Sequence, residues 1–584
     1  DRRQRQMCIR DRVRPVPGCW SHPRATGSWE PQERETMTKA ETMTKAGSGL
    51  NRMGRRRRSV AAAVVGCALL AAGPVASALP THGSPADPGH QPVVPEVLES
   101  FYGQEISWYP CGDTGGMEKT EEQGKFSCAM VTVPMDYNQP DGETIQIAVK
   151  KRAADGESQG SLFINPGGPG GFGVHQVEGV EKKYSKELLA GYDVVGFDPR
   201  GVRDPRGISP STSVDCGDAE SPFEWAISPG QPREGQSFED WAQSYMGKVS
   251  KLEKQCREHS EPGLLDHVNT VSVAKDLDVL RAVSGEKSLN YLGFSYGTEL
   301  GYTYAELFPE HVGRMVLDGA VDSTVSHVEF GQEGGIEGYE KALRSYVQAC
   351  LDGQTGDCPL AGDVEEGVQQ IRALIASADA SPMKTSDPEA KVTGAQLAQI
   401  IQLSFLQSGY WQQLTAALTP AITQNDASGF AEAIKQMGWF KPSNAATLLA
   451  VLCQDRPSQG NMEAWKAQYE QTQELSPTFG ARAINFDMTC AAWGHYSASD
   501  PIPQDVHAEG APPILVVGAT GDPATPYHWS EALAEQLDSG HLLTWEGNAH
   551  GAYGHEDAGY CLTTAVDGFL LDGQLPEDDL VCSG

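Results

Sequence analysis

Residues 288–301 read SLNYLGFSYGTELG, and this stretch decides the fold. An apolar run of strand type leads into the pattern GxSxG around Ser295, and a helical pattern follows it. Gly293 and Gly297 permit a tight strand-to-helix turn, which presents the serine hydroxyl above a helix N-terminus. Residues 156–160, GESQG, match GxSxG without a following helix, so the pattern alone is weak evidence. We predict that Ser295 is a nucleophile; the alternative is an ordinary helix-capping serine.

The flanking sequence alternates short apolar runs with helical patterns. Val273, Leu277 and Leu280, for example, recur at the spacings of three and four that are typical of a helix. Strands bounded by helices favour an α/β fold, in which a mostly parallel sheet carries helices on both faces. The strands that we expect are residues 145–149, 161–165, 192–198, 288–292, 315–318, 514–518 and 542–546.

This alternation stops between about residues 322 and 500, where apolar residues recur at helical spacing and strand patterns are missing. We predict a helical insertion at residues 322–500. It would separate two parts of one α/β core, at residues 96–321 and 501–584. An insertion at the carboxyl edge of a parallel sheet lies over the usual ligand site, so it would act as a cap.

A serine nucleophile needs a base, and the base needs an orienting acid. Asp522 and His550 each follow a predicted late strand, as the chain order Ser, Asp, His of a hydrolase requires. An Asp-Pro turn and a surface histidine are the alternative interpretations, and His541 and His555 are rival bases. We favour His550 because it follows its strand closely and has flanking glycines that let the loop fold back.

A tetrahedral intermediate needs two N–H donors, which form an oxyanion hole. The backbone amide of Tyr296, at the start of the predicted helix, is one candidate. The glycine-rich residues 165–171, NPGGPGG, supply the other, and we expect Gly168 with Gly167 as its nearest rival. A phosphate-binding loop is excluded because no GK[ST] follows. In GFDPRG, Asp198 and Arg200 are expected to brace this loop rather than to contact substrate.

The motifs NPGGPGG, GFDPRG, LGFSYGTELG, GDPATPY and NAHGAYG together resemble those of the secreted tripeptidyl aminopeptidases of the α/β-hydrolase fold, relatives of the prolyl aminopeptidases. The resemblance covers nearly everything from about Glu96 to the C-terminus. It implies a serine exopeptidase that removes short peptides, typically tripeptides, from a free N-terminus, with Ser295, Asp522 and His550 as its triad. Phe172 departs from the family pattern, in which a small residue follows NPGGPGG, so the preferred peptide stays open.

An aminopeptidase must also hold the ammonium group of its substrate, which requires a carboxylate partner. Glu329, Glu333 and Glu337 lie at the start of the predicted cap and are spaced by four, which would place them on one helical face. A solvated acidic face is the alternative interpretation. Asp455 is a further candidate.

Residues 53–78 have the order of a secretory signal peptide. Four arginines begin at Arg55, an apolar stretch too short to span a bilayer follows, and small residues precede a cleavage site that we place after Ala78. Lipidation at Cys67 is the alternative. Residues 1–52 contain the repeat ETMTKA and are expected to lie outside the fold, and residues 79–95 form a Pro-rich lead. We therefore expect a secreted protein.

The chain of 584 residues carries 78 acidic against 45 basic side chains, a net charge of −33. This excess disfavours binding to nucleic acid or to an anionic membrane. Ten cysteines follow residue 78, and an even number in an exported chain suggests five disulfides. Many pairings are open, and we expect sequential neighbours to pair: Cys111 with Cys128, Cys216 with Cys256, Cys350 with Cys358, Cys453 with Cys490, and Cys561 with Cys582. No CxxC pair or His-rich spacing suggests a metal site.

Together with the family resemblance, which implies the peptidase activity, these patterns favour a secreted, monomeric serine peptidase that acts through an acyl-enzyme and needs no metal or organic cofactor. Its partners would be peptides with a free N-terminus. An esterase or lipase is the second hypothesis, because the fold and the triad are shared and only the pocket decides. A non-catalytic binding protein of the same fold is the third, and the intact triad and oxyanion residues argue against it.

Overall fold

The computed structural model describes residues 95–202, 209–217, 230–233, 235–436 and 442–583. The expectations for the leader segment, the signal peptide, Cys67 and almost all of the Pro-rich lead lie outside these residues. Within them, no helix has both the length and the apolar character that crossing a membrane requires.

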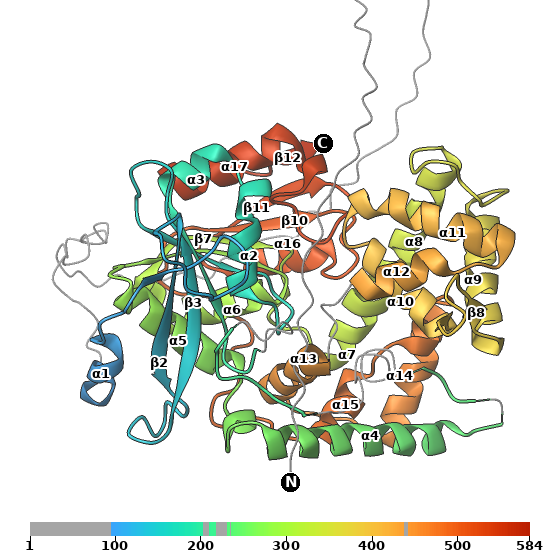
Figure 1. Ribbon diagram of the computed structural model, residues 1–584, viewed down its shortest axis with the longest axis horizontal. Helices are drawn as coiled ribbons and strands as arrows, with labels where there is room; N and C mark the ends of the chain where they lie inside the picture. The colour runs from blue at the N-terminus through green and yellow to red at the C-terminus, as the bar shows by residue number, and fades with distance from the viewer. Residues whose placement is uncertain (1–94, 203–208, 218–229, 234, 437–441, 584) are drawn as a thin grey trace, which may run out of the picture. The chain divides into compact units, whose positions relative to one another are not determined.

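In the described part of the chain, ten strands form one sheet (Figure 1). They are β1 (Tyr109–Pro110), β2 (Phe126–Pro134), β3 (Thr144–Arg152), β4 (Ser161–Asn165), β5 (Asp193–Asp198), β6 (Leu289–Phe294), β7 (Val312–Asp318), β10 (Ile514–Ala519), β11 (Gly540–Glu546) and β12 (Val581–Ser583). Their order in the sheet is β1-β2-β3-β5-β4-β6-β7-β10-β11-β12. From β5 to β12 neighbouring strands are parallel, whereas β1, β2 and β3 form an antiparallel edge next to β5.

The mostly parallel sheet that the sequence predicts is confirmed, and each expected strand overlaps a strand of the sheet. The sequence prediction missed the short strands β1 and β12 and the longer strand β2. This strand is antiparallel and half-exposed at several positions, so it lacks the continuous apolar run of the buried parallel strands. The prediction that residues 322–500 contain no strand was also wrong, because β8 (Met383–Lys384) and β9 (Lys391–Val392) form a two-stranded hairpin there. Strands of two residues are too short to leave a periodic signal.

Helices cover both faces of the sheet, as a parallel sheet with two buried faces requires. One face packs against α2 (Gly173–Gly179), α3 (Lys186–Gly191) and α17 (Gly559–Asp572). The other packs against α5 (Thr270–Val283), α6 (Tyr296–Leu307) and α16 (Tyr527–Gln536). A short helix, α1 (Glu99–Tyr102), lies against α5.

Residues 327–493 are mainly helical and form two groups. The first group has a hydrophobic core of its own and contains α8 (Gly338–Leu351), α9 (Val364–Ala380), α10 (Gly394–Ser404), α11 (Trp411–Gln424) and α12 (Ser428–Gln436) (Figure 1). The second group shares the core of the sheet and packs with α4 (Phe238–His259); it contains α13 (Pro442–Asp455), α14 (Met462–Leu475) and α15 (Phe486–Trp493). A single turn, α7 (His327–Glu329), and a π-helix (Phe330–Glu337) lead into the first group.

Five disulfides join the ten cysteines that the structure describes, and all five expected pairings are confirmed. Four of the bridges close segments of 17 to 40 residues, and the bond between Cys350 and Cys358 closes one of eight. Disulfides of this number are typical of an extracellular protein, because the cytosol keeps thiols reduced.

Candidate active site

Ser295 lies on a sharp turn between β6 and α6. Its backbone has φ 56° and ψ −126°, a conformation that a non-glycine residue adopts only when its surroundings hold it. The Ser295 N–H donates to the carbonyl oxygen of Asp318 at 3.0 Å. On the other side, the Ser295 carbonyl accepts from the Thr298 N–H at 2.8 Å and from the Thr298 hydroxyl at 2.6 Å. The predicted strand-turn-helix around this serine is therefore present.

Two glycines make the turn sterically possible. A Cβ at position 293 would lie 2.4 Å from the Gly297 carbonyl oxygen, and a Cβ at position 297 would lie 2.9 Å from the carbonyl oxygen of Asn165. Both distances are shorter than real Cβ contacts, so side chains there would push the helix away from the sheet. The two glycines of GxSxG thus fix how closely the start of α6 approaches β6 and the end of β4.

Asp522 and His550 lie together at the carboxyl ends of β10 and β11. His550 Nδ1 is 3.0 Å from each carboxylate oxygen of Asp522. Because a carboxylate only accepts, Nδ1 carries the proton and Nε2 is left as the basic nitrogen. The Asp522 side chain is fully buried and also accepts from the N–H groups of Ala524, Thr525 and Gly551. These backbone hydrogen bonds hold the Asp522 carboxylate in place, so that it can orient the imidazole of His550.

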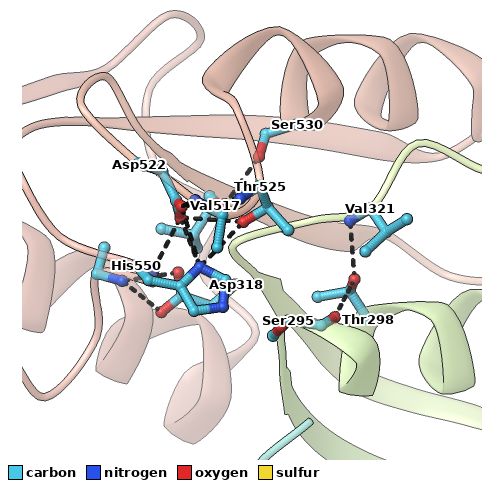
Figure 2. Close-up of polar contacts among 12 residues, drawn as sticks. Ser295, Thr298, Asp318, Val321, Val517, Asp522, Thr525, Ser530 and His550 are labelled. Carbon is cyan, nitrogen blue, oxygen red and sulfur yellow. Dashed lines mark hydrogen bonds and ion pairs between the residues drawn. The ribbon is translucent and has the colours of Figure 1, made fainter. Parts of the chain in front are cut away.

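His550 lies between Asp522 and Ser295, with its second ring nitrogen on the side of Ser295 (Figure 2). In the described residues, no hydrogen bond joins that nitrogen to the Ser295 hydroxyl. Catalytic hydrogen bonds are often long in a free enzyme and shorten when substrate binds. Burial alone would lower the pKa of His550, but the charge and hydrogen bond of Asp522, together with the charge of Asp318, outweigh burial and raise it above its ordinary value.

The rival histidines occupy other places. His541 lies near the amino end of β11, paired in register with Leu515, whereas Asp522 follows the carboxyl end of β10. His555 stacks on Trp545, and its Nε2 lies 3.3 Å from the His550 carbonyl oxygen. Burial lowers the pKa of His555, so this ring is held in its neutral form. Neither histidine has the contact with Asp522 that His550 has.

Two further side chains around His550 were not predicted from the sequence. Thr525 donates its hydroxyl to Asp522 Oδ2 at 3.0 Å and lies 3.2 Å from His550 Nδ1 (Figure 2). The buried carboxylate of Asp318 accepts from the N–H groups of Ala552 and Tyr553, at distances of 2.7 to 3.1 Å. The sequence signal for Asp318 was present, because a polar residue that ends a buried parallel strand lies at the ligand edge of the sheet. For Thr525 the only sequence signal was its position in the turn after Asp522.

The glycine-rich segment after β4 packs directly on the nucleophile turn. A Cβ at Gly167 would lie 2.9 Å from the Ser295 Cβ and 3.1 Å from the Tyr296 nitrogen. The Gly167 N–H already donates to Asn165 Oδ1 at 2.9 Å, whereas the Gly168 N–H has no protein acceptor among the described residues. Tyr296 begins α6, so its N–H has no acceptor within the helix. This difference favours Gly168 over Gly167 as the second oxyanion donor.

Asp198 and Arg200 lie beneath this segment and are buried. Asp198 Oδ1 accepts from the N–H of Val174 in α2, the helix that follows the glycine-rich segment. Arg200 pairs with Asp276 at 2.6 Å and donates to backbone carbonyls, so both residues serve the framework. Phe172 is buried at the N-terminus of α2.

The three glutamates proposed for the substrate amine do not share an α-helical face. Glu329 ends α7, and Glu333 and Glu337 lie in the π-helix, where hydrogen bonds span five residues and a spacing of four no longer aligns side chains. Glu329 accepts from the N–H and hydroxyl of Ser326, as a helix cap. Glu337 pairs with Lys341 at 2.9 Å on the surface. The side chain of Glu333 lies outside the part that the structure describes.

Asp455, the further candidate for the amine, lies beneath α6. It accepts from the N–H and the hydroxyl of Thr270, both at 2.7 Å, and is almost fully buried. Burial, together with the charge of Glu299, raises the pKa of Asp455 to about 7. Its two carboxylate oxygens are thus engaged within the protein and not offered to a ligand.

The helical insertion also contacts the base loop, a contact that no sequence pattern indicated. The backbone N–H of His550 donates to the carbonyl oxygen of Leu406 at 2.9 Å, and the Ser408 hydroxyl donates to Asp557. Both insertion residues lie in the connection between α10 and α11. The loop that carries His550 is therefore held by the sheet on one side, through Asp318, and by the insertion on the other.

The chain is similar to several known hydrolases. Residues 476–582 match the family described as TAP-like protein. The serine protease Hip1 of Mycobacterium tuberculosis is 32% identical over 506 residues, 83% of this chain and 92% of that protein. The tripeptidyl aminopeptidase of Streptomyces lividans is 30% identical over 82% of this chain and 86% of its own length. Carboxylesterase B of M. tuberculosis is 31% identical over 90% and 99%.

Each of these relatives covers more than four fifths of the chain, and the nucleophile turn, the acid–base pair and the amide donors lie at one edge of a hydrolase-type sheet. The chain therefore belongs to the TAP-like family of serine hydrolases, with the α/β-hydrolase fold.

Proposed function

We propose that this protein is a secreted serine exopeptidase that releases short peptides, typically tripeptides, from free N-termini. The observation that carries the proposal is the contact between His550 Nδ1 and both oxygens of Asp522, next to a serine held at positive φ. The similarity to a tripeptidyl aminopeptidase over most of both chains supports a peptide substrate. The five disulfides support secretion.

The chemistry follows from the positions of these groups. Ser295 Oγ would attack the scissile carbonyl carbon while His550 Nε2 takes the hydroxyl proton and later gives it to the leaving amine. Asp522 holds the proton on Nδ1 and stabilises the imidazolium that forms. The N–H groups of Gly168 and Tyr296 would bind the oxyanion, each worth roughly 3 kcal/mol of barrier. Water then hydrolyses the acyl-enzyme by the same route.

A free N-terminus requires an anionic partner in the site, and Glu333 is the candidate that we propose to test first. Its neighbours Gly334 and Gly338 pack on the carbonyls of Ala524 and Pro523, so this turn of the π-helix lies on the loop that carries Asp522. Glu333→Gln should raise KM for substrates with a free amine and leave KM for N-acetylated substrates unchanged. Unchanged KM for both kinds of substrate would show that Glu333 does not bind the substrate amine.

The second candidate function is ester hydrolysis. It is favoured by one observation, the 31% identity to carboxylesterase B over nearly the whole of that protein. Acyl transfer from an ester uses the same nucleophile, base and oxyanion donors, so the catalytic geometry serves both reactions.

A substrate panel separates these functions. Tripeptidyl, aminoacyl and N-blocked 4-nitroanilides would be compared with 4-nitrophenyl esters, using Ser295→Ala as the inactive control. We expect the highest kcat/KM on tripeptidyl amides with a free amine. Strong cleavage of esters and of blocked peptides, without preference for the free amine, would favour the esterase. Failure of Ser295 to react with a fluorophosphonate probe would favour a non-catalytic binding protein.

A further inference from the structure

A chain of buried hydrogen bonds lies directly beneath the nucleophile turn and ends in the helical insertion. It consists of Tyr296, Thr270 and Asp455, which we call the Asp455 chain. Tyr296 begins α6, Thr270 begins α5, and Asp455 ends α13. All three residues are buried. The chain thus connects the residue after the nucleophile to a carboxylate that lies 159 positions later in the sequence.

When Asp455 is ionised, the number of protons fixes the direction of these hydrogen bonds, because a carboxylate only accepts. The Thr270 hydroxyl donates to Asp455 Oδ2 at 2.7 Å. A threonine hydroxyl has a single proton, so it can only accept from its other neighbour, the Tyr296 hydroxyl, at 2.7 Å. Tyr296 therefore donates to Thr270, and Thr270 donates to Asp455. The second oxygen of Asp455 accepts the Thr270 N–H, so the carboxylate also holds the first turn of α5.

The chain restrains the residue whose backbone N–H would bind the oxyanion. Ser295 is held at a strained φ and ψ, and relaxation of that strain would rotate the peptide between Ser295 and Tyr296. That rotation would turn the Tyr296 N–H away from the oxyanion. A side chain anchored at its hydroxyl end opposes the rotation, and Gly167 packs against the same peptide, since a Cβ there would lie 3.1 Å from the Tyr296 nitrogen.

We propose that Asp455 is a positioning residue for the oxyanion hole, acting through Thr270 on Tyr296. The inference rests on the proposed role of the Tyr296 N–H as an oxyanion donor. It gives the helical insertion a part in the chemistry, because α13 supplies the carboxylate. The next residue, Arg456, pairs with Glu299 of α6 at 2.5 Å, so two consecutive residues of the insertion hold the nucleophile helix.

The electrostatic environment of Asp455 supports this role. A buried carboxyl with a raised pKa and a neighbouring acid, Glu299, is costly to keep ionised, and a framework position could be filled by an amide instead. Perturbed carboxyls of this kind are concentrated at functional sites. The polar groups that interact with Asp455 are Thr270, Glu299, Arg456, Tyr302 and, through Thr270, Tyr296.

The test removes single hydrogen bonds of the Asp455 chain. Thr270→Val deletes the central hydroxyl with little change of shape, Thr270→Ser retains it, and Asp455→Asn removes one acceptor. Tyr304→Phe is the matched control, because the Tyr304 hydroxyl is buried in the same helix and donates to Asp278 at 2.9 Å, remote from Ser295 in the helix. Steady-state kcat and KM would be measured with the ester or peptide that the wild type cleaves, and folding by thermal unfolding.

We expect kcat to fall about tenfold in Thr270→Val and in Asp455→Asn, with KM within about twofold of the wild type. Complete loss of an oxyanion donor lowers kcat by a factor of about 10²–10³, and these variants would only misplace the donor. Thr270→Ser should restore kcat, and Tyr304→Phe should retain it. If Thr270→Val does not fold, Tyr296→Phe breaks the same hydrogen bond by removing one oxygen atom.

Wild-type kcat in the folded Thr270→Val and Asp455→Asn variants would overturn the inference. An equal fall of kcat in Tyr304→Phe would do the same, because any loss of a buried hydrogen bond would then suffice. A wild type that cleaves no substrate and does not react with a fluorophosphonate would instead contradict the proposed function itself. The two failures are therefore distinguishable.

Discussion

The carbonyl oxygen of Asp318 accepts the backbone N–H of Ser295 at 3.0 Å. The carboxylate of Asp318 accepts the N–H groups of Ala552 and Tyr553, just beyond His550. One residue at the end of β7 therefore holds both the nucleophile turn and the base loop, by its main chain and its side chain respectively. The distance between the serine and the imidazole depends on this residue.

Replacing Asp318 should misplace the base without unfolding the protein. Asp318 Oδ2 accepts from both loop N–H groups and Oδ1 accepts from Ala552 alone, so the amide nitrogen of Asp318→Asn removes at least one of these hydrogen bonds and places a donor beside a loop N–H. We therefore expect kcat to fall about tenfold, within the range of a misplaced catalytic group. Asp538→Asn, on the surface, is the control. Steady-state kinetics of both variants check this, and a kcat equal to that of the wild type would show that the Asp318 carboxylate does not position the loop.

The same substitution should change how stability depends on pH. Burial raises the pKa of Asp318 from 3.8 to about 7, so the folded state retains a proton that the unfolded state releases. The contribution of Asp318 to stability therefore falls as the pH rises from about 4 to about 7. Thermal unfolding over this range should show a loss of stability in the wild type that is smaller in Asp318→Asn. Parallel curves for the two proteins would contradict the raised pKa.

Activity should decline in acid. The reaction needs neutral His550, and the charge of Asp522 raises the pKa of this histidine, so protonation begins at a higher pH than for a free imidazole. We expect kcat/KM to fall as the pH drops through the raised pKa. A profile that stays flat well below pH 6.5 would mean that another group is the base.

Asp522→Asn should separate the two roles of the acid. Loss of the tautomer restraint should lower kcat by about 10³ to 10⁴. Loss of the negative charge should also move the acidic limb of the residual activity to lower pH, because the remaining effect of burial lowers the pKa of His550. The pH profile of kcat/KM measures both effects. An acidic limb that stays in place would contradict the assigned pairing.

Glu329 should affect stability rather than substrate binding. Its carboxylate accepts from the N–H and hydroxyl of Ser326 in a capping box, so Glu329→Ala should lower the free energy of unfolding by about 1 kcal/mol. KM for substrates with a free amine should not change. Chemical denaturation tests the first statement and steady-state kinetics the second. A several-fold rise of KM would show that Glu329 binds the substrate amine after all.

The bond between Cys453 and Cys490 should support activity as well as folding. This bond spans 37 residues, so the double variant Cys453→Ala with Cys490→Ala should lower the free energy of unfolding by about 2–4 kcal/mol. Because Cys453 lies two positions before Asp455, the same variant should also reduce kcat. The control is the same change at Cys350 and Cys358, a short bridge in the first helical group, which should lower Tm with little effect on kcat. Equal losses of kcat in both pairs would argue against a local effect on the site.

Several parts of the fold and site could be predicted because their signals are local. A glycine two residues on each side of Ser295, between a strand pattern and a helix pattern, defines the nucleophile turn wherever it lies in space. Polar residues that follow buried strands, such as Asp522 and His550, are brought to one edge because parallel strands all end there. The disulfides were also predictable because each cysteine pairs with its neighbour in the sequence, at most 40 positions away.

Only the tertiary structure revealed the long-range contacts that hold the predicted catalytic groups in place. The contact of Asp318 with the base loop and that of Asp455 with Thr270 join positions 234 and 185 residues apart, and no periodicity encodes such pairs. The π-helix at Phe330–Glu337 is a second example, because Gly334 and Gly338 bring this segment close to the acid loop, nearly 190 positions later in the sequence. The sequence determined the chemical groups and the strands that carry them. The folded chain determined how those groups are held, because hydrogen bonds between distant segments form only after the sheet and the insertion have come together.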